Sequence, residues 1–398
     1  MRPPPIITAD RSQLYSLITD PETCRRIEEG QGTPVLVVDC DRVREQFGRL
    51  SAALPGVDLY YAIKALPHRS VVNTLGQVGA FFDVASLGEI RLLQEFHINP
   101  RRTVFTHPIK GDRDIRRALR FGCTTFVIDN PLELEKFSAY RHRVGLFLRV
   151  SFRGPDAVVD LSRKFGCEPA EVLHLVNRAR NLGVHIKGLC FHVGSQSHTP
   201  DAHVAAIEVC RDLMLRAETM GVVMSVLNIG GGFPVPYSPD TIDIEPFCAP
   251  IRKALGTLPS HLRIIAEPGR YLAAPSVTSV SSVVGKAFRE GRWWYYLDDG
   301  VYGSFSGRIF DKANYPLTVL RTSDTQTPSV LAGPTCDSVD VIAEDILLPE
   351  LEIGDLVVGR MMGAYTMASA TNFNSLEKAR IVVLHERPPS VASVAYIG

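Results

Sequence analysis

A lysine interrupts an apolar run near the start of the chain, and it is the first residue that could carry chemistry. The run reads LYYAIKALPHRSVV, and Lys64 stands towards its end, just before a proline. Lysine is among the residues least often buried without a partner. Its head could reach the solvent while its stem packs on apolar surface, or its amine could be a nucleophile that forms an imine with a carbonyl cofactor. Other residues have to decide between these two readings.

Short β-rich segments alternate with helical patterns from residue 57 onwards. The eight segments span residues 57–63, 80–85, 102–106, 124–128, 144–150, 186–193, 225–230 and 262–267. Strand alternating with helix predicts βα units around a parallel sheet, and eight such units fit an α/β fold with a (β/α)8 barrel. A doubly wound open sheet is the alternative, but no G-x-G-x-x-G motif opens the first helix.

The pattern changes after about residue 276. Segments such as SVTSVSSVVGKAF and RWWYYLDD are β-rich, with no helical pattern between successive strands. This is typical of a separate, mostly antiparallel β domain. We therefore predict a cofactor-binding barrel at 36–276 and a β-rich domain built from 1–35 and 277–398. The segment 33–41 lies outside the eight-strand count and belongs either to the β domain or to a linker.

Composition limits the possible partners. The 398 residues include 43 Lys plus Arg and 43 Asp plus Glu, so the balanced charge predicts neither nucleic acid nor a membrane surface as partner. Zero net charge favours association, which is consistent with an oligomer. The eight cysteines are scattered without metal-like spacing, so we expect reduced thiols, no metal and a cytoplasmic protein. No signal peptide and no apolar run of roughly 18 or more residues is found.

Polar residues and glycines gather at the ends of the predicted strands, where a (β/α)8 barrel builds its active site. Each of them alone could have a purely structural role, as three successive glycines do when they form a tight turn. Their joint occurrence at one end of one barrel favours a binding site. These residues are Lys64, Asp83, Ser86, Arg149, His192, Gly194, Ser195, Gly230, Gly231, Gly232, Glu267, Gly269 and Arg270.

The combination of groups points to one cofactor. A glycine-rich loop after the seventh strand suits a phosphate, because amides without side chains approach the phosphate oxygens closely. A lysine able to form an imine and a carboxylate able to face a ring nitrogen complete the requirements of pyridoxal 5'-phosphate (PLP). The carboxylate would keep the pyridine nitrogen protonated, so that the ring withdraws electrons. This favours the imine reading of Lys64.

Nine motifs give the sequence a family resemblance. They are YYAIKA, FFDVAS, LSRKFG, FHVGSQ, NIGGGFP, AEPGRY, DDGVYGSF, AGPTCDSVD and GAYT. The chain resembles the fold-type III PLP-dependent decarboxylases, the ornithine, lysine and diaminopimelate decarboxylase family. GPTCD and DGVYGSF are closest to the eukaryotic-type ornithine decarboxylases. Three departures stand out. Ser375 and Leu376 replace the usual Gly and Phe after TNFN, His68 replaces a small or amide residue, and FTHPIK differs from the Asn-Pro common in that loop.

The resemblance implies four catalytic residues. Lys64 would bind PLP as an imine, His192 would stack on the pyridine ring, Glu267 would pair with the ring nitrogen, and Cys336 would protonate Cα. The other cofactor-binding residues would be Asp83, Arg149, Ser195, Gly231, Gly232, Gly269, Arg270 and Tyr365. The resemblance further implies a homodimer with shared active sites, to which the partner subunit contributes Cys336, Asp337 and Phe373.

The resemblance also implies where the substrate binds, namely at Asp311, Asp337, Tyr302 and Phe373. Carboxylates facing a distal ammonium make charge-assisted bonds worth roughly 1.5–3 kcal/mol each, whereas a distal carboxylate would meet like charge. We therefore predict decarboxylation of a basic amino acid, L-ornithine to putrescine, with L-lysine to cadaverine also open. The two substrates differ by one methylene, worth about 1–3 kcal/mol in a pocket, and the sequence does not separate them.

Several alternatives stay open at this point. The substrate could be diaminopimelate, a D-amino acid or a carboxylated polyamine. Alanine racemase shares the architecture, but it places an arginine on the pyridine nitrogen, which Glu267 contradicts. A catalytically dead relative of ornithine decarboxylase that binds a regulator is the non-enzyme alternative, although Lys64, Glu267 and Cys336 are all present. A barrel of unrelated activity is the last.

Overall fold

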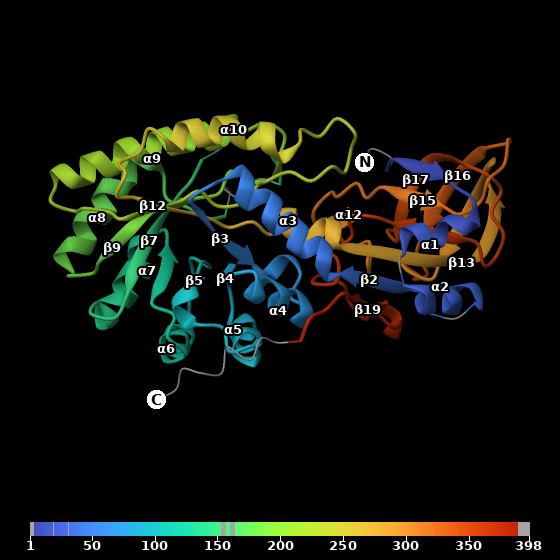
Figure 1. Ribbon diagram of the computed structural model, residues 1–398, viewed down its shortest axis with the longest axis horizontal. Helices are drawn as coiled ribbons and strands as arrows, with labels where there is room; N and C mark the ends of the chain where they lie inside the picture. Colours follow the sequence, from blue (N-terminus) through green and yellow to red (C-terminus); the bar gives the residue numbers. More distant parts are fainter. Residues whose placement is uncertain (1–3, 19, 31, 153–156, 160–163, 389–398) are drawn as a thin grey trace. The chain divides into compact units, whose positions relative to one another are not determined.

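The computed structural model describes residues 4–18, 20–30, 32–152, 157–159 and 164–388 (Figure 1). The first three residues of the LSRKFG motif therefore lie outside the described residues. The chain forms two compact units. The β-rich unit consists of Met1–Val43, Val235–Thr241 and Leu272–Glu386, and the barrel unit of Arg44–Pro234, Ile242–Tyr271 and Arg387–Gly398. The domain limits predicted from the sequence, with the barrel at 36–276, stay a prediction.

Eight parallel strands close the barrel, in the order β11-β12-β3-β4-β5-β6-β7-β9. They are β3 (Val57–Ala62), β4 (Phe81–Val84), β5 (Thr103–Phe105), β6 (Thr125–Ile128), β7 (Gly145–Val150), β9 (Ile186–Phe191), β11 (Val226–Asn228) and β12 (Arg263–Ala266). All eight strands predicted from the sequence are present, and the predicted (β/α)8 barrel is confirmed. The seventh is shorter than predicted because Gly230, with φ of 67°, turns the chain away from the sheet.

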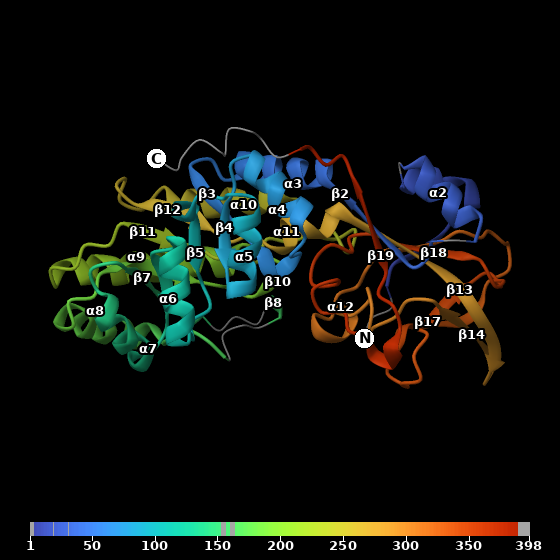
Figure 2. The same ribbon diagram turned by 90° about the horizontal axis from the view of Figure 1, so that it is seen from below.

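Helices follow the strands and surround the barrel (Figures 1 and 2). The apolar side chains of these helices recur at helical spacing and are buried, as with Ile115, Ala118 and Leu119 of α6. Local sequence signals fix their ends: Asn130 accepts a hydrogen bond from the Glu133 amide at the start of α7, and Gly122, with φ of 103°, ends α6. The helices are α3 (Cys40–Ala53), α4 (Arg69–Gln77), α5 (Leu87–Glu95), α6 (Asp112–Phe121), α7 (Pro131–Lys136), α8 (Val172–Asn181), α9 (Asp201–Thr219), α10 (Ile244–Leu255) and α11 (Arg270–Ala273).

One apolar layer fills the barrel between its two ends. Because side chains alternate across each strand, every second residue points inward. The inward-pointing side chains of seven strands form a buried cluster: Tyr60, Val104, Val127, Phe147, Cys190, Val226 and Ile265. The barrel is therefore a packed core with two separate mouths, one at the carboxyl ends of the strands and one at their amino ends.

The β-rich unit is built on a nine-stranded sheet with the order β1-β15-β18-β13-β14-β16-β17, in which β2 pairs with β13 and β19. Three pairs are parallel, β1 with β15, β14 with β16 and β2 with β19, and the others are antiparallel. The predicted, mostly antiparallel β domain is therefore confirmed. The open assignment of segment 33–41 is settled for β2, which belongs to this sheet.

The strands of this sheet are β1 (Ile6–Thr8), β2 (Val35–Asp39), β13 (Val277–Arg289), β14 (Arg292–Leu297), β15 (Leu317–Val319), β16 (Thr327–Ala332), β17 (Val341–Leu348), β18 (Leu356–Gly359) and β19 (Arg380–Leu384). Three short helices accompany them: α1 (Leu14–Leu17), α2 (Pro21–Glu28) and α12 (Gly307–Phe310). In the barrel unit, β8 (Ala157–Val159) and β10 (Ser195–Ser197) form a separate antiparallel pair.

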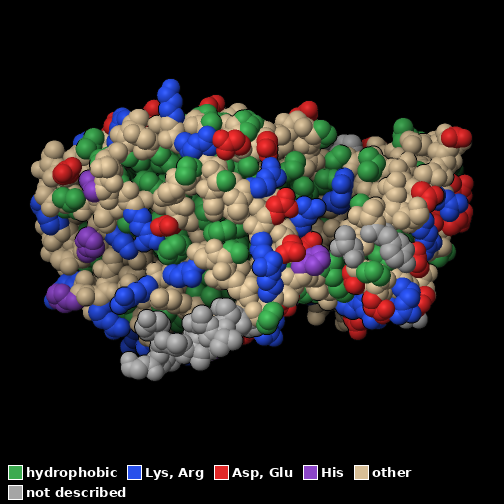
Figure 3. Space-filling model, in the orientation of Figure 1, with side chains coloured by type: hydrophobic (Ala, Val, Ile, Leu, Met, Phe, Trp, Pro, Cys, Tyr) green, Lys and Arg blue, Asp and Glu red, His purple; other side chains and the backbone are tan. Residues whose placement is uncertain are grey.

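The surface agrees with the balanced charge of the sequence. On the face drawn in Figure 3, acidic and basic side chains are both spread over the two units. Among the described residues, no helix is long and apolar enough to cross a membrane.

Candidate active site

The carboxyl-terminal mouth of the barrel brings Lys64 and Asp83 together. Lys64 lies in a short 3-10 turn, Ile63–Ala65, directly after β3, and its Nζ is 3.2 Å from Oδ2 of Asp83 on β4. The Asp83 side chain is 1% exposed, and its other oxygen accepts a hydrogen bond from the Thr106 hydroxyl. The Lys64 side chain is 46% exposed. A buried carboxylate therefore anchors an amine that a ligand can reach.

A second lysine near this mouth is bound differently. Lys110, in the loop between β5 and α6, is 2% exposed, and its Nζ donates to the carbonyl oxygens of His107, Pro108 and Val127 at 2.8, 2.8 and 2.5 Å. Burial lowers its pKa to about 8. All three donors of the ammonium are used for backbone carbonyls. Lys110 therefore holds a loop, whereas the amine of Lys64 is accessible.

Glu267 follows β12 and faces the same mouth. The Asn228 side-chain amide at the end of β11 donates to its Oε1, and the Glu267 backbone amide donates to the Gly230 carbonyl at 2.7 Å. Burial raises the pKa of Glu267 to about 7, and the neighbouring Asp83 charge adds to this, while Lys64 lowers it. The carboxyl can therefore hold or share a proton near neutral pH.

A further carboxyl near this mouth was not predicted from the sequence. Ser86 caps α5 by accepting a hydrogen bond from the Glu89 amide, and Glu89 accepts one from the Ala85 amide at 2.5 Å. Burial raises the pKa of Glu89 to about 7, and Asp83 contributes in the same direction. The S-x-x-E spacing was visible in the sequence, but burial of the carboxyl was not.

His192, after β9, is a neutral imidazole. Burial lowers its pKa well below the usual value, and the positive charges of Arg149 and Lys64 lower it further. Its Nδ1 accepts a hydrogen bond from the Gly194 amide at 3.1 Å, so the neutral ring carries its proton on Nε2. Because the His192 ring is neutral and has a fixed orientation, it can stack on an aromatic ligand. It carries no positive charge that would repel a protonated ligand ring.

The three glycines after β11 lie where a side chain would clash with neighbouring atoms. A Cβ on Gly231 would lie 2.7 Å from the Glu267 carbonyl oxygen and 3.1 Å from Nε2 of His192. A Cβ on Gly232, whose φ is 103°, would lie 2.7 Å from the Gly194 carbonyl oxygen. The backbone of this loop therefore approaches the mouth more closely than any other residue type would permit.

A buried cation lies beside the glycine loop. Arg270, which follows the turn at the buried Gly269, is 5% exposed, and its Nε and Nη2 donate to the Ser195 hydroxyl at 3.1 and 3.0 Å. The Ser197 hydroxyl is buried and has no hydrogen-bond partner among the described residues. A buried guanidinium, a glycine cradle and a spare hydroxyl fit the phosphate group of a cofactor.

His203, on α9, was missed by the sequence analysis. It is fully buried, and its Nε2 lies 3.0 Å from the Gly231 carbonyl oxygen, so the ring supports the glycine loop from behind. Its ring stacks on Phe233 with centroids 5.5 Å apart. Burial lowers the pKa of His203 to about 4, so the ring is neutral. A histidine inside a helical pattern gives no sequence signal for this contact.

The β-rich unit carries the other predicted residues, and three of them form a cluster. The rings of Tyr302 and Phe373 stack with centroids 4.4 Å apart, and the Tyr302 hydroxyl donates to a carboxylate oxygen of Asp337. This hydrogen bond lowers the pKa of Asp337, which is therefore an anion at neutral pH. Next to it, the Cys336 thiol is exposed, whereas the other seven cysteines are buried.

The remaining two predicted residues of this unit, Asp311 and Tyr365, do not belong to that cluster. Asp311 is the partly exposed C-cap of α12, and Tyr365 is half-buried with a φ of 58°. Close to Phe373, Asn374 and Ser375 also have positive φ, 55° and 56°. The departure from glycine at position 375 therefore places a serine in backbone geometry that favours glycine.

Known proteins resemble the chain over most of its length. The family model described as "Pyridoxal-dependent decarboxylase, pyridoxal binding domain" matches residues 40–274. A lysine/ornithine decarboxylase of Vibrio vulnificus complexed with putrescine is 52% identical, covers 89% of this chain and 95% of its own, and has a TM-score of 0.85. Its complex with cadaverine has a TM-score of 0.87 at 51% identity, over 92% and 100% of the two chains.

Two further relatives widen the range of substrates. A lysine/ornithine decarboxylase of Selenomonas ruminantium is 37% identical over 90% of this chain and 92% of its own length. The arginine decarboxylase of Paramecium bursaria Chlorella virus, bound to agmatine, is 30% identical with a TM-score of 0.86, over 94% of this chain and all of its own. All of these relatives act on amino acids with a positively charged end.

Proposed function

Because this chain belongs to the pyridoxal-dependent decarboxylases, we propose that it converts L-ornithine to putrescine and L-lysine to cadaverine. The family predicted from the motifs is confirmed. The chain is a PLP-dependent decarboxylase of basic amino acids, as predicted, and PLP is its cofactor. The choice of ornithine and lysine is the proposed part.

The proposal assigns the cofactor to the carboxyl-terminal mouth. Lys64 would hold the aldehyde carbon of PLP, His192 would stack on the ring, and Glu267 would face the ring nitrogen. Asp83 and Arg149 would lie beside the cofactor. The phosphate group would lie against Ser195, Gly232, Arg270 and Tyr365, and Gly231 and Gly269 would also contact the cofactor. Bound PLP supplies an electron sink that accepts the electron pair of the Cα–carboxylate bond.

The residues of the chain would control protons and charge around that sink. Asp83 orients the Lys64 amine through the 3.2 Å contact. Glu267, with a pKa of about 7, would keep a proton at the ring nitrogen. The neutral His192 ring would exclude water from one face of the cofactor. Cys336 would deliver a proton to Cα after carbon dioxide has left, and general acids of this kind contribute about 10²–10⁴-fold to rate.

The substrate preference rests on negative charge in the β-rich unit. Asp337 is an anion held by Tyr302. With Asp311 it would bind a distal ammonium by charge-assisted hydrogen bonds, and the stacked rings of Tyr302 and Phe373 would cover the methylene chain. A distal carboxylate, as in diaminopimelate, would be repelled. Arginine also ends in a cation, so arginine decarboxylation is the nearest competitor.

We further propose a homodimer with shared active sites. Cys336 and Asp337 of the partner subunit would complete the site formed by Lys64. An exposed thiol among seven buried ones supports this role, because a proton donor must be reachable by the substrate. A cytoplasmic location is also part of the proposal, supported by eight cysteines that all remain free thiols.

The single observation that carries the proposal is the accessible Lys64 amine held 3.2 Å from a buried Asp83 at the mouth that also holds Glu267 and His192. Carbon dioxide release by PLP-saturated protein tests it, with L-ornithine, L-lysine, L-arginine, diaminopimelate and D-lysine as substrates. We expect the highest kcat/KM for ornithine and lysine, differing by about 10- to 200-fold at most. A higher kcat/KM for any of the other three would contradict the proposed substrate.

The variant Asp337→Asn tests substrate recognition separately from the decarboxylation reaction itself. This variant should raise KM for lysine and ornithine at least tenfold, since one charge-assisted contact contributes about 1.5–3 kcal/mol. Asp324→Asn, an exposed aspartate in the same unit, is the matched control and should leave KM unchanged. Equal KM values for Asp337→Asn and wild type would remove Asp337 from the substrate site.

A further inference from the structure

The amino-terminal mouth of the barrel contains a polar cavity of about 30 Å³. Its floor is the apolar layer that separates the two mouths, to which Val104, Phe147, Val226 and Ile265 contribute. Its rim comes from the first residues of the strands and from the turn before β5. The polar side chains that line it are Tyr60, Arg101, Thr103, Thr125, Lys187 and Arg263. In most barrels this end serves stability rather than chemistry, so a recess lined by polar groups needs an explanation.

Positive charge dominates this cavity. Three of its lining residues are cations, Arg101, Lys187 and Arg263. Arg263 forms an ion pair with Asp58, Nε to Oδ2 at 2.5 Å. Within the described part of the chain, neither Arg101 nor Lys187 has a carboxylate within ion-pair distance. The cavity therefore has more positive charge than its single carboxylate neighbour can balance.

Lys187 is the residue with most capacity left to bind a ligand. It lies at the start of β9, and its Nζ makes one long hydrogen bond, 3.3 Å to the Thr125 hydroxyl. Burial lowers the pKa of Lys187, and the charge of Arg263 lowers it further. An ammonium with three donors and one weak partner, in a partly buried position, gains from an anion that compensates its lost hydration. Thr125, whose hydroxyl accepts from Lys187, keeps its own proton to donate.

We propose that this cavity binds a small tetrahedral oxoanion of the phosphate or sulfate type, at the opposite end of the barrel from PLP. A volume of about 10–15 Å³ accommodates one water-sized atom, so the cavity holds two to three ligand oxygens. The remaining ligand atoms face the solvent. Lys187, Arg101 and Arg263 supply the compensating charge, and Thr125 supplies a neutral donor.

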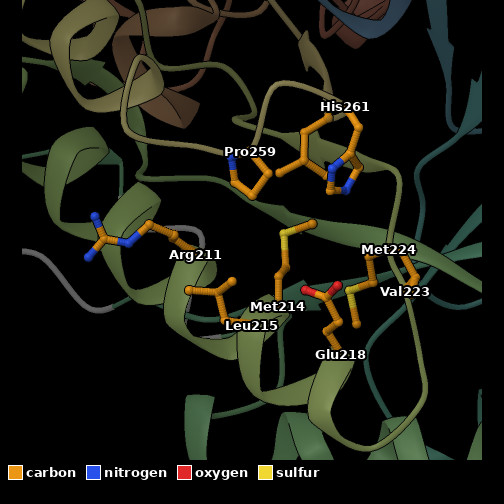
Figure 4. A pocket seen from close by; sticks show the side chains of 9 residues that line it. Arg211, Met214, Leu215, Glu218, Val223, Met224, Pro259 and His261 are labelled. Atoms are coloured by element: carbon orange, nitrogen blue, oxygen red, sulfur yellow. The ribbon is translucent and has the colours of Figure 1, made fainter.

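A second cavity among the described residues of the barrel unit shows why charge decides this assignment. It lies between α9 and the segment that precedes β12 (Figure 4), with a volume of about 20 Å³. The side chains of Met214, Leu215, Met224 and Pro259 turn their apolar atoms towards it. Its cation, Arg211, already contacts Asp212 at 3.2 Å. This recess offers no anion site, in contrast to the cavity at the strand starts.

Isothermal titration of the holoenzyme with inorganic phosphate tests the proposal. Bound PLP occupies the phosphate cradle at the other mouth, so that any further binding is separate from it. At constant ionic strength, set with chloride, we expect one saturable site per chain and a rise of the melting temperature with phosphate concentration. Sulfate should compete with phosphate. No saturable heat and no thermal shift would overturn the proposal.

Variants locate the site. Lys187→Met should weaken phosphate binding about tenfold or more, while Lys187→Arg should retain it. Arg101→Gln changes an exposed side chain that does not support the barrel, and should weaken binding a few-fold. Lys253→Met, on the exposed side of α10, is the matched control. Equal affinity in Lys187→Met and Lys253→Met would overturn the assignment to this cavity.

Two further arms identify the source of the anion. Adenosine monophosphate and glycerol phosphate carry the same group on an organic residue, and weaker binding than inorganic phosphate would assign the site to the free ion. Competition by an acidic peptide equal to that of phosphate would overturn the small-anion reading in favour of a protein contact. Decarboxylase activity is measured in parallel, and it should be unchanged in Lys187→Met, so that loss of the proposed function and loss of this site are distinguishable.

Discussion

The two mouths of the barrel are made from the same eight strands but differ in the sign and burial of their charges. At the carboxyl ends, Lys64 is paired with buried Asp83, and Glu267 and His192 have pKa values shifted towards their neutral forms. At the amino ends, the cations Arg101 and Lys187 have no carboxylate within ion-pair distance in the described part of the chain. The carboxyl-terminal mouth therefore combines buried carboxyl groups with cations, whereas the charged side chains of the amino-terminal cavity are cations.

This difference indicates that the barrel backbone alone does not determine which charged side chains line each mouth. Two strands contribute side chains to both mouths: β9 begins next to Lys187 and ends next to His192, and β12 begins at Arg263 and ends before Glu267. The backbone positions these residues, and the side chains at the strand ends decide the chemistry. Single substitutions of these side chains should therefore affect one mouth without the other.

The largest expected difference is between the two lysines. Lys64→Ala should lower kcat for decarboxylation by roughly three orders of magnitude or more, as removal of a covalent nucleophile does in other enzymes. Lys187→Ala should leave kcat within about twofold, because it lies behind the apolar layer. Steady-state carbon dioxide release measures both. A comparable loss in the two variants would show that the mouths are not independent.

The next effect is the pH dependence of folding at the carboxyl-terminal mouth. The pKa of Glu267 rises from 4.5 to about 7 on folding, so the folded apoprotein binds this proton more tightly than the unfolded chain. The resulting stabilisation is fully present below pH 4.5 and is lost as the pH rises to about 7, with a magnitude of about 3 kcal/mol. Urea unfolding of the apoprotein between pH 4 and 8 measures it.

Glu267→Gln provides the control for this pH effect. Glutamine does not titrate, so the variant should lack the Glu267 contribution while keeping that of Glu89, whose pKa is also about 7. The difference between the two stability curves therefore isolates Glu267. Parallel curves for wild type and Glu267→Gln would contradict the raised pKa.

A smaller effect is expected from His203, which supports the glycine loop. His203→Phe keeps the ring stacked on Phe233 but removes the donor to the Gly231 carbonyl. An unsatisfied buried carbonyl costs about 1–3 kcal/mol, so PLP should dissociate at about tenfold higher concentration. His203→Gln, which can still donate, should recover part of the affinity. Absorbance titration of the apoprotein with PLP gives both constants, and equal affinity in His203→Phe and wild type would refute the positioning role.

The smallest effect belongs to Asp58 at the amino-terminal mouth. Its ion pair with Arg263 has both side chains more than a third exposed, and such pairs contribute about 0.2–1 kcal/mol. Asp58→Asn should therefore change the free energy of unfolding by less than about 1 kcal/mol, while raising the affinity for phosphate because a negative charge is removed. A large loss of stability would mean that this mouth is primarily structural.

Much of the barrel could be predicted because its signals are local. The eight strands follow from β-rich segments and helical spacing, and the residues of the carboxyl-terminal mouth follow from their positions at strand ends. The NIGGGFP loop predicted close backbone approach, and the structure places a hypothetical Cβ of Gly231 within 2.7 Å of a backbone oxygen.

What escaped prediction depends on contacts between distant segments. His203 meets Gly231 across 28 residues, Lys110 meets Val127, and Asn228 meets Glu267. No spacing rule links such pairs, because the fold brings them together. The cavity at the amino ends escaped for the same reason, since Arg101, Lys187 and Arg263 come from three separate parts of the chain. The roles proposed for the site residues of both units, from Lys64 and Glu267 to Cys336 and Asp337, stay predictions.

One experiment tests directly whether the cofactor bonds to Lys64 at the carboxyl-terminal mouth. Borohydride reduction of the PLP-loaded protein converts an imine to a stable secondary amine, and peptide mass spectrometry then identifies the modified lysine. We predict a single pyridoxyl label on the peptide that contains Lys64. A label on Lys110 or Lys187 instead, or no label in a protein that binds PLP, would contradict a covalent bond between PLP and Lys64.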